Sequence, residues 1–205
     1  MRFLQIILSL SLCLTAITGD YIVFESKYSS SQVFRAFADS SVHASIGLLS
    51  ATLFFTHEIS ISRYASVCNI IFCTILSSFI DIDHVMEAKS IYLKDMHNLK
   101  RGIFHCTTFW LIVSLLFILY SYVVKKLNIY ILTFMIIIAY TSHHIRDGNR
   151  RGLWLYPFGH TPPISKFIYV ALIGILPNIY AKIFTYMENG FYRHNVVNAG
   201  YKMVV

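Results

Sequence analysis

Long apolar runs, separated by short polar segments, recur along this sequence. Six of them approach the roughly 17 to 25 residues that a membrane-spanning helix needs, and they cover residues 3–23, 33–55, 65–86, 102–124, 127–144 and 167–184. The pattern predicts an all-α fold, a polytopic membrane helix bundle of five to six spans. Residues 1–205 are then expected to form a single integral membrane domain.

The first apolar run has two interpretations. A single basic residue at Arg2, an apolar stretch and a small-residue end at Gly19 are typical of a cleaved secretory signal. The alternative is a retained first span that carries Asp20 within its length. The residues of this run leave both open, which is why the prediction is five to six spans.

Composition and charge agree with a membrane protein. Only 13% of the residues are charged and 56% are hydrophobic, whereas a soluble domain carries nearer a quarter charged residues. The net charge of +7 comes mostly from Lys and Arg beside apolar runs, where they anchor helix ends. Because no basic stripe with interleaved aromatics occurs, we expect the bilayer as partner and no nucleic acid. The localisation is integral and multi-pass, and the sequence does not identify the organelle.

Acidic residues, histidines and an arginine gather at the ends of four predicted spans. The start of the second span, the end of the third, the start of the fourth and the end of the fifth all lie on the same side of a bundle of alternating direction. We therefore expect the four groups to converge at one membrane face. They are Asp39 with His43, Asp81 with Asp83 and His84, Arg101 with His105, and His143 with His144 and Asp147.

These residue types suggest a metal site. Ionisable groups at membrane depth cost at least about 2.5 kcal/mol each and indicate a functional site by default. Imidazole with carboxylate suits zinc, manganese or iron, so we expect a divalent metal, zinc or manganese above all. An open position on such a metal would activate water for attack on a phosphoryl or acyl centre. The predicted ligands are His43, Asp81, Asp83, His105, His143 and Asp147, and the predicted catalytic residues are Arg101, His144 and Arg146.

A structural interpretation of the same residues stays open. An acidic residue at a helix end is often a cap, and an interfacial histidine is often a polar anchor. The segment from Ile145 to Lys166 is expected to be a basic loop whose arginines, Arg146, Arg150 and Arg151, could clamp a phosphate. It could equally be an interfacial loop with its aromatic residues at headgroup level.

Three segments carry a family resemblance. They are Asp81 to His84 (DIDH), Arg101 to Thr107 (RGIFHCT) and Thr141 to Gly159 (TSHHIRDGNRRGLWLYPFG). Together they resemble the transmembrane protein 267 family, from about Asp39 to Pro177. The resemblance implies that the first apolar run is a retained helix.

The same motifs are similar to a bacterial family of inner-membrane proteins described as metal-dependent hydrolases. That family shows an early His, an Asp-x-Asp, an Arg-Gly-x-x-His-Ser and a Ser-His-x-x-x-Asp followed by Gly and a Trp-Pro stretch. Two departures occur here, since Cys106 stands where Ser is usual and Lys100 where a His often precedes the Arg. The corresponding residues are His43, Asp81, Asp83, Arg101, Gly102, His105, Ser142, His143, Asp147, Gly152, Trp154 and Pro157.

Two hypotheses follow for the function. The first is a candidate metal-dependent hydrolase that acts on a lipid or lipid-linked substrate at one membrane face. The alternative is a non-catalytic membrane scaffold, or a degenerate relative that keeps the polar cluster for structure. A proton-coupled transporter is a weaker third interpretation, because the polar residues lie at helix ends rather than near the middle of the membrane.

Overall fold

The computed structural model describes residues 2–57, 59, 61–88 and 102–202, and the chain folds as an all-α helical bundle, which confirms the predicted fold class. The long helices are α1 (Arg2–Asp20), α2 (Gln32–Phe55), α3 (Arg63–Phe79), α5 (Thr107–Val124), α6 (Leu127–Arg151) and α7 (Lys166–Lys202). Shorter elements are the π-helical turn η1 (Tyr21–Glu25), α4 (Ile82–Ala88), the 3-10 turn η3 (Ile103–His105), and the strands β1 (Trp154–Leu155) and β2 (Gly159–His160).

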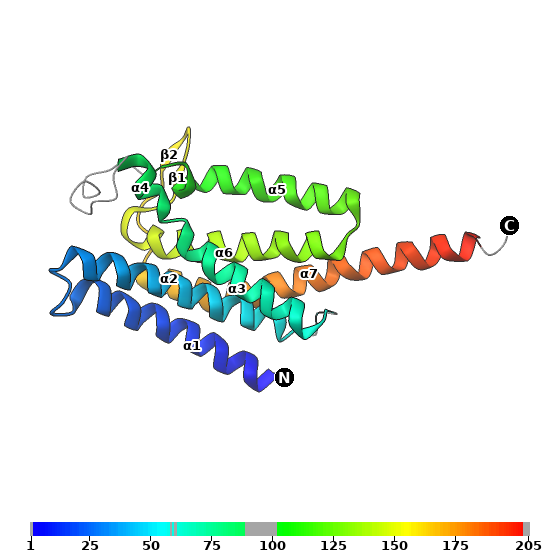
Figure 1. Ribbon diagram of the computed structural model, residues 1–205, viewed down its shortest axis with the longest axis horizontal. Coiled ribbons are helices and arrows are strands. Elements are labelled where there is room, and N and C mark those ends of the chain that lie inside the picture. The colour runs from blue at the N-terminus through cyan, green and yellow to red at the C-terminus, as the bar shows by residue number, and fades with distance from the viewer. Residues whose placement is uncertain (1, 58, 60, 89–101, 203–205) are drawn as a thin grey trace.

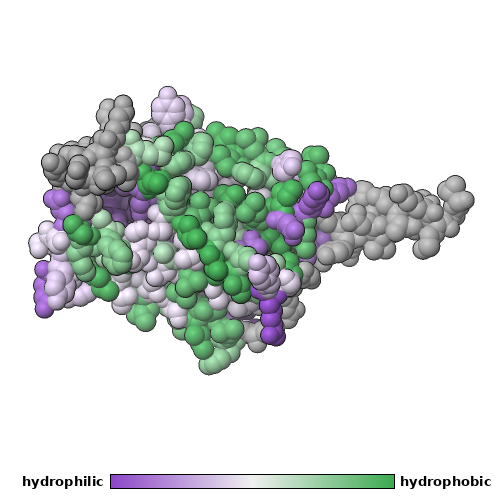
Figure 2. Space-filling model, viewed as in Figure 1, coloured by the Kyte–Doolittle hydropathy of each residue, from purple (hydrophilic) through white to green (hydrophobic). Residues whose placement is uncertain are grey.

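Five helical segments of the described chain are long and apolar enough to cross a membrane. They are Arg2–Glu25, Arg63–His84, Thr107–Val124, Leu127–Arg151 and Lys166–Glu188. The remaining long helix, α2, packs against α1, α3, α6 and α7. Figure 2 shows apolar residues across the middle of the visible face and hydrophilic residues nearer both ends. A band of this kind is what a protein surrounded by lipid requires.

The long helices alternate in direction along the chain. Each side of the bundle therefore gathers the C-terminal ends of three long helices and the N-terminal starts of the other three. The ends of α1, α3 and α6 and the starts of α2, α5 and α7 lie together at the left of Figure 1, with α4 and the β1–β2 hairpin beside them. We call this side the polar end.

The N-terminal ends of α2 and α3 are capped by serines. Ser31 and Ser62 accept hydrogen bonds from the backbone N–H groups of Phe34 and Ala65, respectively.

Close approach of α2 and α3 is set by Gly47. A Cβ at this position would lie 2.6 Å from the Cβ of Ser77 and 3.2 Å from the carbonyl oxygen of Cys73. The Ser77 hydroxyl also donates to the carbonyl of His43 at 3.0 Å. The backbone of Ser77 is therefore held against α2, next to the residues of the polar end.

Two helices are longer than the apolar pattern predicts. Helix α6 continues to Arg151, through a segment expected to be loop, because Arg146 and Asp147 find partners on other helices. It ends at Gly152, whose φ of 70° suits glycine. Helix α7 continues past residue 184 to Lys202, with Pro177 inside it and no later proline in the sequence to stop it.

Candidate metal centre

Four ligand-type atoms from three parts of the chain converge at the polar end. The Nε2 atom of His143 lies 3.6 Å from Asp81 Oδ1 and 3.6 Å from Asp147 Oδ2. The Nε2 atom of His105 lies at the same 3.6 Å from each of these oxygens and 3.5 Å from His143 Nε2. A tetrahedral zinc ion with bonds of about 2.0 to 2.1 Å has ligand-to-ligand separations of about 3.3 to 3.4 Å. The spacing is therefore close to that of a metal site.

Hydrogen bonds on the far side of each imidazole fix how the rings are turned. His143 Nδ1 lies 2.8 Å from the carbonyl oxygen of Ser77, which can only accept, so Nδ1 carries the hydrogen and Nε2 offers a lone pair. His105 Nδ1 lies 3.0 Å from Asp83 Oδ2, which also accepts the backbone N–H of His105 at 3.1 Å. Metal-bound histidines commonly make such contacts to a carbonyl or carboxylate.

Two more histidines lie at the edges of this group. His43 Nε2 is 3.4 Å from Asp147 Oδ1, and its ring stacks on that of His143 with 3.8 Å between centroids. The ring of His84 lies 4.7 Å from that of His105. Donor atoms of His43, Asp81, His143 and Asp147 all lie within 4.8 Å of one another, and so do those of Asp81, His84 and His105.

A buried arginine ties the cluster to the first two helices. Arg146 is 1% exposed and donates from Nε to Asp20 at 3.2 Å, from Nη1 to Asp39 at 2.6 Å and from Nη1 to His43 Nε2 at 2.9 Å. The hydroxyl of Tyr169 also donates to Asp20. A buried guanidinium needs such partners to offset its desolvation.

Arg150 neutralises part of the remaining charge. Its Nη2 atom lies 2.9 Å from Asp147 Oδ1 and 3.4 Å from Asp39 Oδ2, and its guanidinium covers the ring of Phe24 at 4.3 Å. The side chain is 34% exposed. Arg150 can therefore hold Asp147 in place and still reach solvent.

Negative charge is in surplus around His105, which precedes α5. Burial lowers the pKa of this imidazole, but its contacts with Asp147, Asp81 and Asp83 outweigh the burial and raise the pKa to about 11. Carboxylates that favour a proton so strongly also favour a divalent cation in its place.

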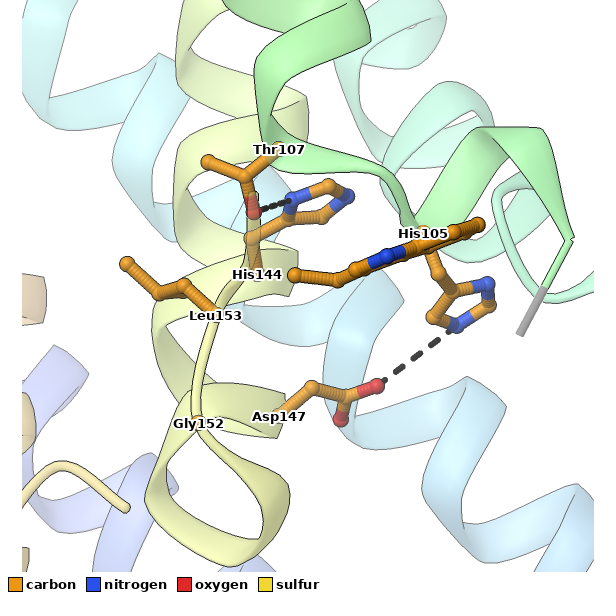
Figure 3. A pocket seen from close by; sticks show the side chains of 7 residues that line it. His105, Thr107, His144, Asp147, Gly152 and Leu153 are labelled. Atoms are coloured by element: carbon orange, nitrogen blue, oxygen red, sulfur yellow. Dashed lines mark hydrogen bonds and ion pairs between the residues drawn. The ribbon is translucent and has the colours of Figure 1, made fainter. Parts of the chain in front are cut away.

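A small pocket opens beside the cluster (Figure 3). Thr107 and His144 lie on one side, and His105 and Asp147, joined by a dashed line, lie on the other. Because His144 Nε2 faces the carbonyl oxygen of Phe104 at 2.9 Å and must donate to it, His144 Nδ1 accepts the Thr107 hydroxyl at 3.0 Å. The lining residues are His105, Thr107, His144, Asp147, Gly152, Leu153 and Trp154.

Most of the residues predicted as metal ligands lie in this cluster, with different roles. The structure brings His43, Asp81, His105, His143 and Asp147 together, whereas Asp83 orients His105 from behind. Among the predicted catalytic residues, His144 lines the pocket and Arg146 is enclosed in ion pairs. Arg101 lies outside the described residues.

Sequence reasoning missed three contributors to the site. In the sequence, Asp20 stands out only as a polar residue of the first apolar run, although an acidic residue in such a run itself indicates a functional site. Thr107 closes the motif Arg101 to Thr107, but nothing in the sequence marks its hydroxyl as a partner of His144. Ser77 contributes its backbone carbonyl to His143, and no sequence pattern reports such a contact.

Comparison with known proteins finds similar proteins of one name, and that name states no activity. The chain is 38% identical to transmembrane protein 267 of Bos taurus over 148 residues and 36% identical to that of Xenopus laevis over 147 residues. Each match covers 71% of this chain and 66% of the relative, and a Danio rerio relative matches at 38%. No family model matches the chain, and no solved structure does.

These relatives support assignment to the transmembrane protein 267 family. The aligned part spans slightly less than two thirds of the relatives' own length. With five candidate membrane-spanning helices, the chain is an integral, multi-pass membrane protein. The similarity to bacterial hydrolases gains no support from these matches and stays a prediction from the motifs.

Proposed function

We propose that this chain, a relative of transmembrane protein 267, is a metal-dependent hydrolase of a lipid or lipid-linked substrate. One observation carries the proposal. The Nε2 atoms of His105 and His143 lie 3.5 Å apart, and each lies 3.6 Å from Asp81 Oδ1 and from Asp147 Oδ2. Such a group repels itself unless a cation or a proton lies within it.

The ligand set fits zinc or manganese. Two imidazole nitrogens and two carboxylate oxygens are typical ligands of both ions. The contacts of His143 with Ser77 and of His105 with Asp83 supply the outer interactions that such sites usually have. A divalent cation held here would lower the pKa of a bound water and polarise a phosphoryl or acyl oxygen.

The location suits a substrate delivered by the bilayer. Asp81 follows α3, His105 precedes α5, and His143 and Asp147 lie in the C-terminal part of α6, so these residues lie toward the polar end. Beside it, the β1–β2 hairpin exposes Tyr156 and Phe158, which are 65% and 87% exposed, and aromatic residues are enriched at headgroup level. Trp154 of the same hairpin lines the pocket, so a headgroup beside the hairpin is also beside the cluster.

Protein groups around the pocket have distinct tasks in this proposal. His144 Nδ1 accepts a hydrogen bond from the Thr107 hydroxyl, so it can take the Thr107 proton when that hydroxyl receives one from the pocket. Arg150, partly exposed beside Asp147, can stabilise negative charge on a substrate. Arg146 positions Asp39 and His43 and is too enclosed to touch a substrate.

The test is hydrolysis by the purified protein in lipid nanodiscs loaded with Mn²⁺ or Zn²⁺. The probes are p-nitrophenyl phosphate, p-nitrophenyl butyrate and a fluorescent phospholipid. We expect turnover of at least one probe and a loss of about a hundredfold or more on Asp147→Asn. We expect no loss on Arg63→Gln, which removes an exposed charge at the start of α3, away from the cluster.

Two results would contradict the enzyme proposal. Turnover that survives both chelation and Asp147→Asn would assign the activity elsewhere. A protein that binds the cation yet hydrolyses none of the probes would favour the non-catalytic scaffold. Interhelical polar contacts in membranes stabilise by only about 0.6 kcal/mol on average, so a scaffold would keep this many polar groups for little gain.

A further inference from the structure

The cluster contains more donors than one tetrahedral ion can use. Asp81, His143 and Asp147 fill three positions, and two histidines compete for the fourth. His43 Nε2 lies 3.4 Å from Asp147 Oδ1, and His105 Nε2 lies 3.6 Å from Asp147 Oδ2. His84 is left over, although its donor atom lies within 4.8 Å of those of Asp81 and His105.

We infer that the site takes two divalent cations that share Asp81. One is held by His43, Asp81, His143 and Asp147, and the second by Asp81, His84 and His105, so that each histidine serves one ion. The inference rests on the proposed function, in that the cluster must be a metal site, and it adds His84 as a ligand. Paired ions of this kind are common in enzymes that hydrolyse phosphoesters and amides.

Asp81 is placed to bridge the two groups. It lies at the junction of α3 and α4, and its Oδ1 atom is 3.6 Å from both His143 Nε2 and His105 Nε2. These two nitrogens belong to different groups in the two-ion arrangement. A carboxylate has two oxygens and can serve both ions.

The local charge fits two cations better than one. Among the described residues of the cluster and its supporting shell, five carboxylates occur with only two guanidinium groups, those of Arg146 and Arg150. The five are Asp20, Asp39, Asp81, Asp83 and Asp147. The balance is three negative charges, so one divalent cation leaves the centre negative, whereas two leave it positive. Only a positive centre attracts an anionic phosphoester headgroup.

The two groups differ in openness. The four-residue group includes His43 and His143, which are 1% and 0% exposed, and it can fill a tetrahedral shell. The group of Asp81, His84 and His105 offers three donors, and Asp81 and His84 are only half-buried. Three protein ligands with an open position are typical of a catalytic ion. His105 also lines the pocket, so we assign the second ion to the substrate side.

Binding at His43 requires one exchange of partners. His43 Nε2 now accepts a hydrogen bond from Arg146 Nη1 at 2.9 Å and would give it up to an ion. Arg146 keeps Asp20 and Asp39, so its charge stays compensated.

The number of bound ions tests the inference without any assay of activity. Chelator-stripped protein comprising residues 1–205, in detergent, is titrated with Mn²⁺, and the free ion is followed by its six-line electron paramagnetic resonance signal. We expect saturation at two Mn²⁺ per chain in the parent and in the control His160→Ala, which removes an exposed histidine outside both ligand groups. We expect one per chain in His84→Ala and in the larger His84→Gln, each checked for parental helicity by circular dichroism.

The outcomes separate the inference from the proposed function. Saturation of the parent at one Mn²⁺ per chain would overturn the second site while keeping the metal centre. Two ions in both folded His84 variants would also overturn it. No bound ion in the folded parent would overturn the proposed function itself. The parent titration distinguishes one bound ion from two even if both His84 variants fail to fold.

Discussion

The imidazoles of His105 and His143 point their Nε2 atoms at each other across 3.5 Å. His143 carries its hydrogen on the opposite nitrogen, where it bonds to the Ser77 carbonyl, so its Nε2 is an acceptor. Two carboxylate oxygens lie 3.6 Å from the same atom. Acceptors that face one another in this way repel unless a proton or a metal cation lies between them. The predictions below concern this group and the residues that hold it in place.

Asp83→Asn is expected to weaken metal binding while leaving the bundle folded. The carboxylate holds His105 through both its ring and its backbone N–H, and an amide can replace only part of this. Loss of such an outer contact typically costs 10- to 100-fold in metal affinity. Competition with a fluorescent zinc chelator measures the change, with His160→Ala as the matched control. Unchanged affinity would mean that Asp83 does not support a ligand.

Gly102→Ala is expected to damage the same contact from the other side. A Cβ at Gly102 would fall on the carboxylate of Asp83, so that side chain must leave His105. We expect the variant to match Asp83→Asn in metal affinity, and the double variant to be no worse than either single one, because both act on one contact. Additive losses in the same chelator competition would contradict this.

Asp20→Ala should destabilise the bundle rather than act on metal binding directly. The change leaves Arg146 and Tyr169 without a shared partner, and breaking a buried ion pair costs roughly 3 to 5 kcal/mol. We expect a clearly lower thermal unfolding temperature by circular dichroism. Glu25→Gln, which removes a charge from the adjoining turn η1, is the control and should unfold near the parent. Equal unfolding temperatures for the two variants would show that the Asp20 contact is not stabilising.

Removal of the metal should lower stability by mass action. With free Mn²⁺ at a hundredfold its Kd, binding stabilises the folded state by about 2.7 kcal/mol. A chelator should therefore lower the unfolding temperature of the parent, and the double variant His143→Ala, Asp147→Ala should not respond to it. A parent that unfolds at the same temperature with and without chelator would argue against an occupied site.

The order of the apolar runs predicts which helix ends meet, because successive membrane-spanning helices alternate in direction. That rule alone brings Asp81, His105, His143 and Asp147 to one end. It does not say which way each helix faces, and so it could not separate Asp83, which holds a ligand, from Asp81, which faces the centre.

Contacts between residues far apart in the sequence could not be predicted from the apolar pattern, for a similar reason. The contact of Asp20 with Arg146 joins residues 126 positions apart, and spacing within one helix carries no information about it. The apolar pattern ends this helix too early, at residue 144 rather than Arg151, because Arg146, Asp147 and Arg150 are residue types common in loops. In the structure each of them has a charged or polar partner on the helix or on α2.

The most direct test of the metal centre is the metal content of the detergent-purified protein. Inductively coupled plasma mass spectrometry is applied to the parent, to His143→Ala, Asp147→Ala and to His160→Ala, all at equal helicity. The account predicts at least one zinc or manganese ion per chain in the parent and in His160→Ala, and none in the double variant. A folded parent that holds no metal, even after incubation with Zn²⁺ or Mn²⁺, would contradict it and leave the cluster as a structural ion-pair network.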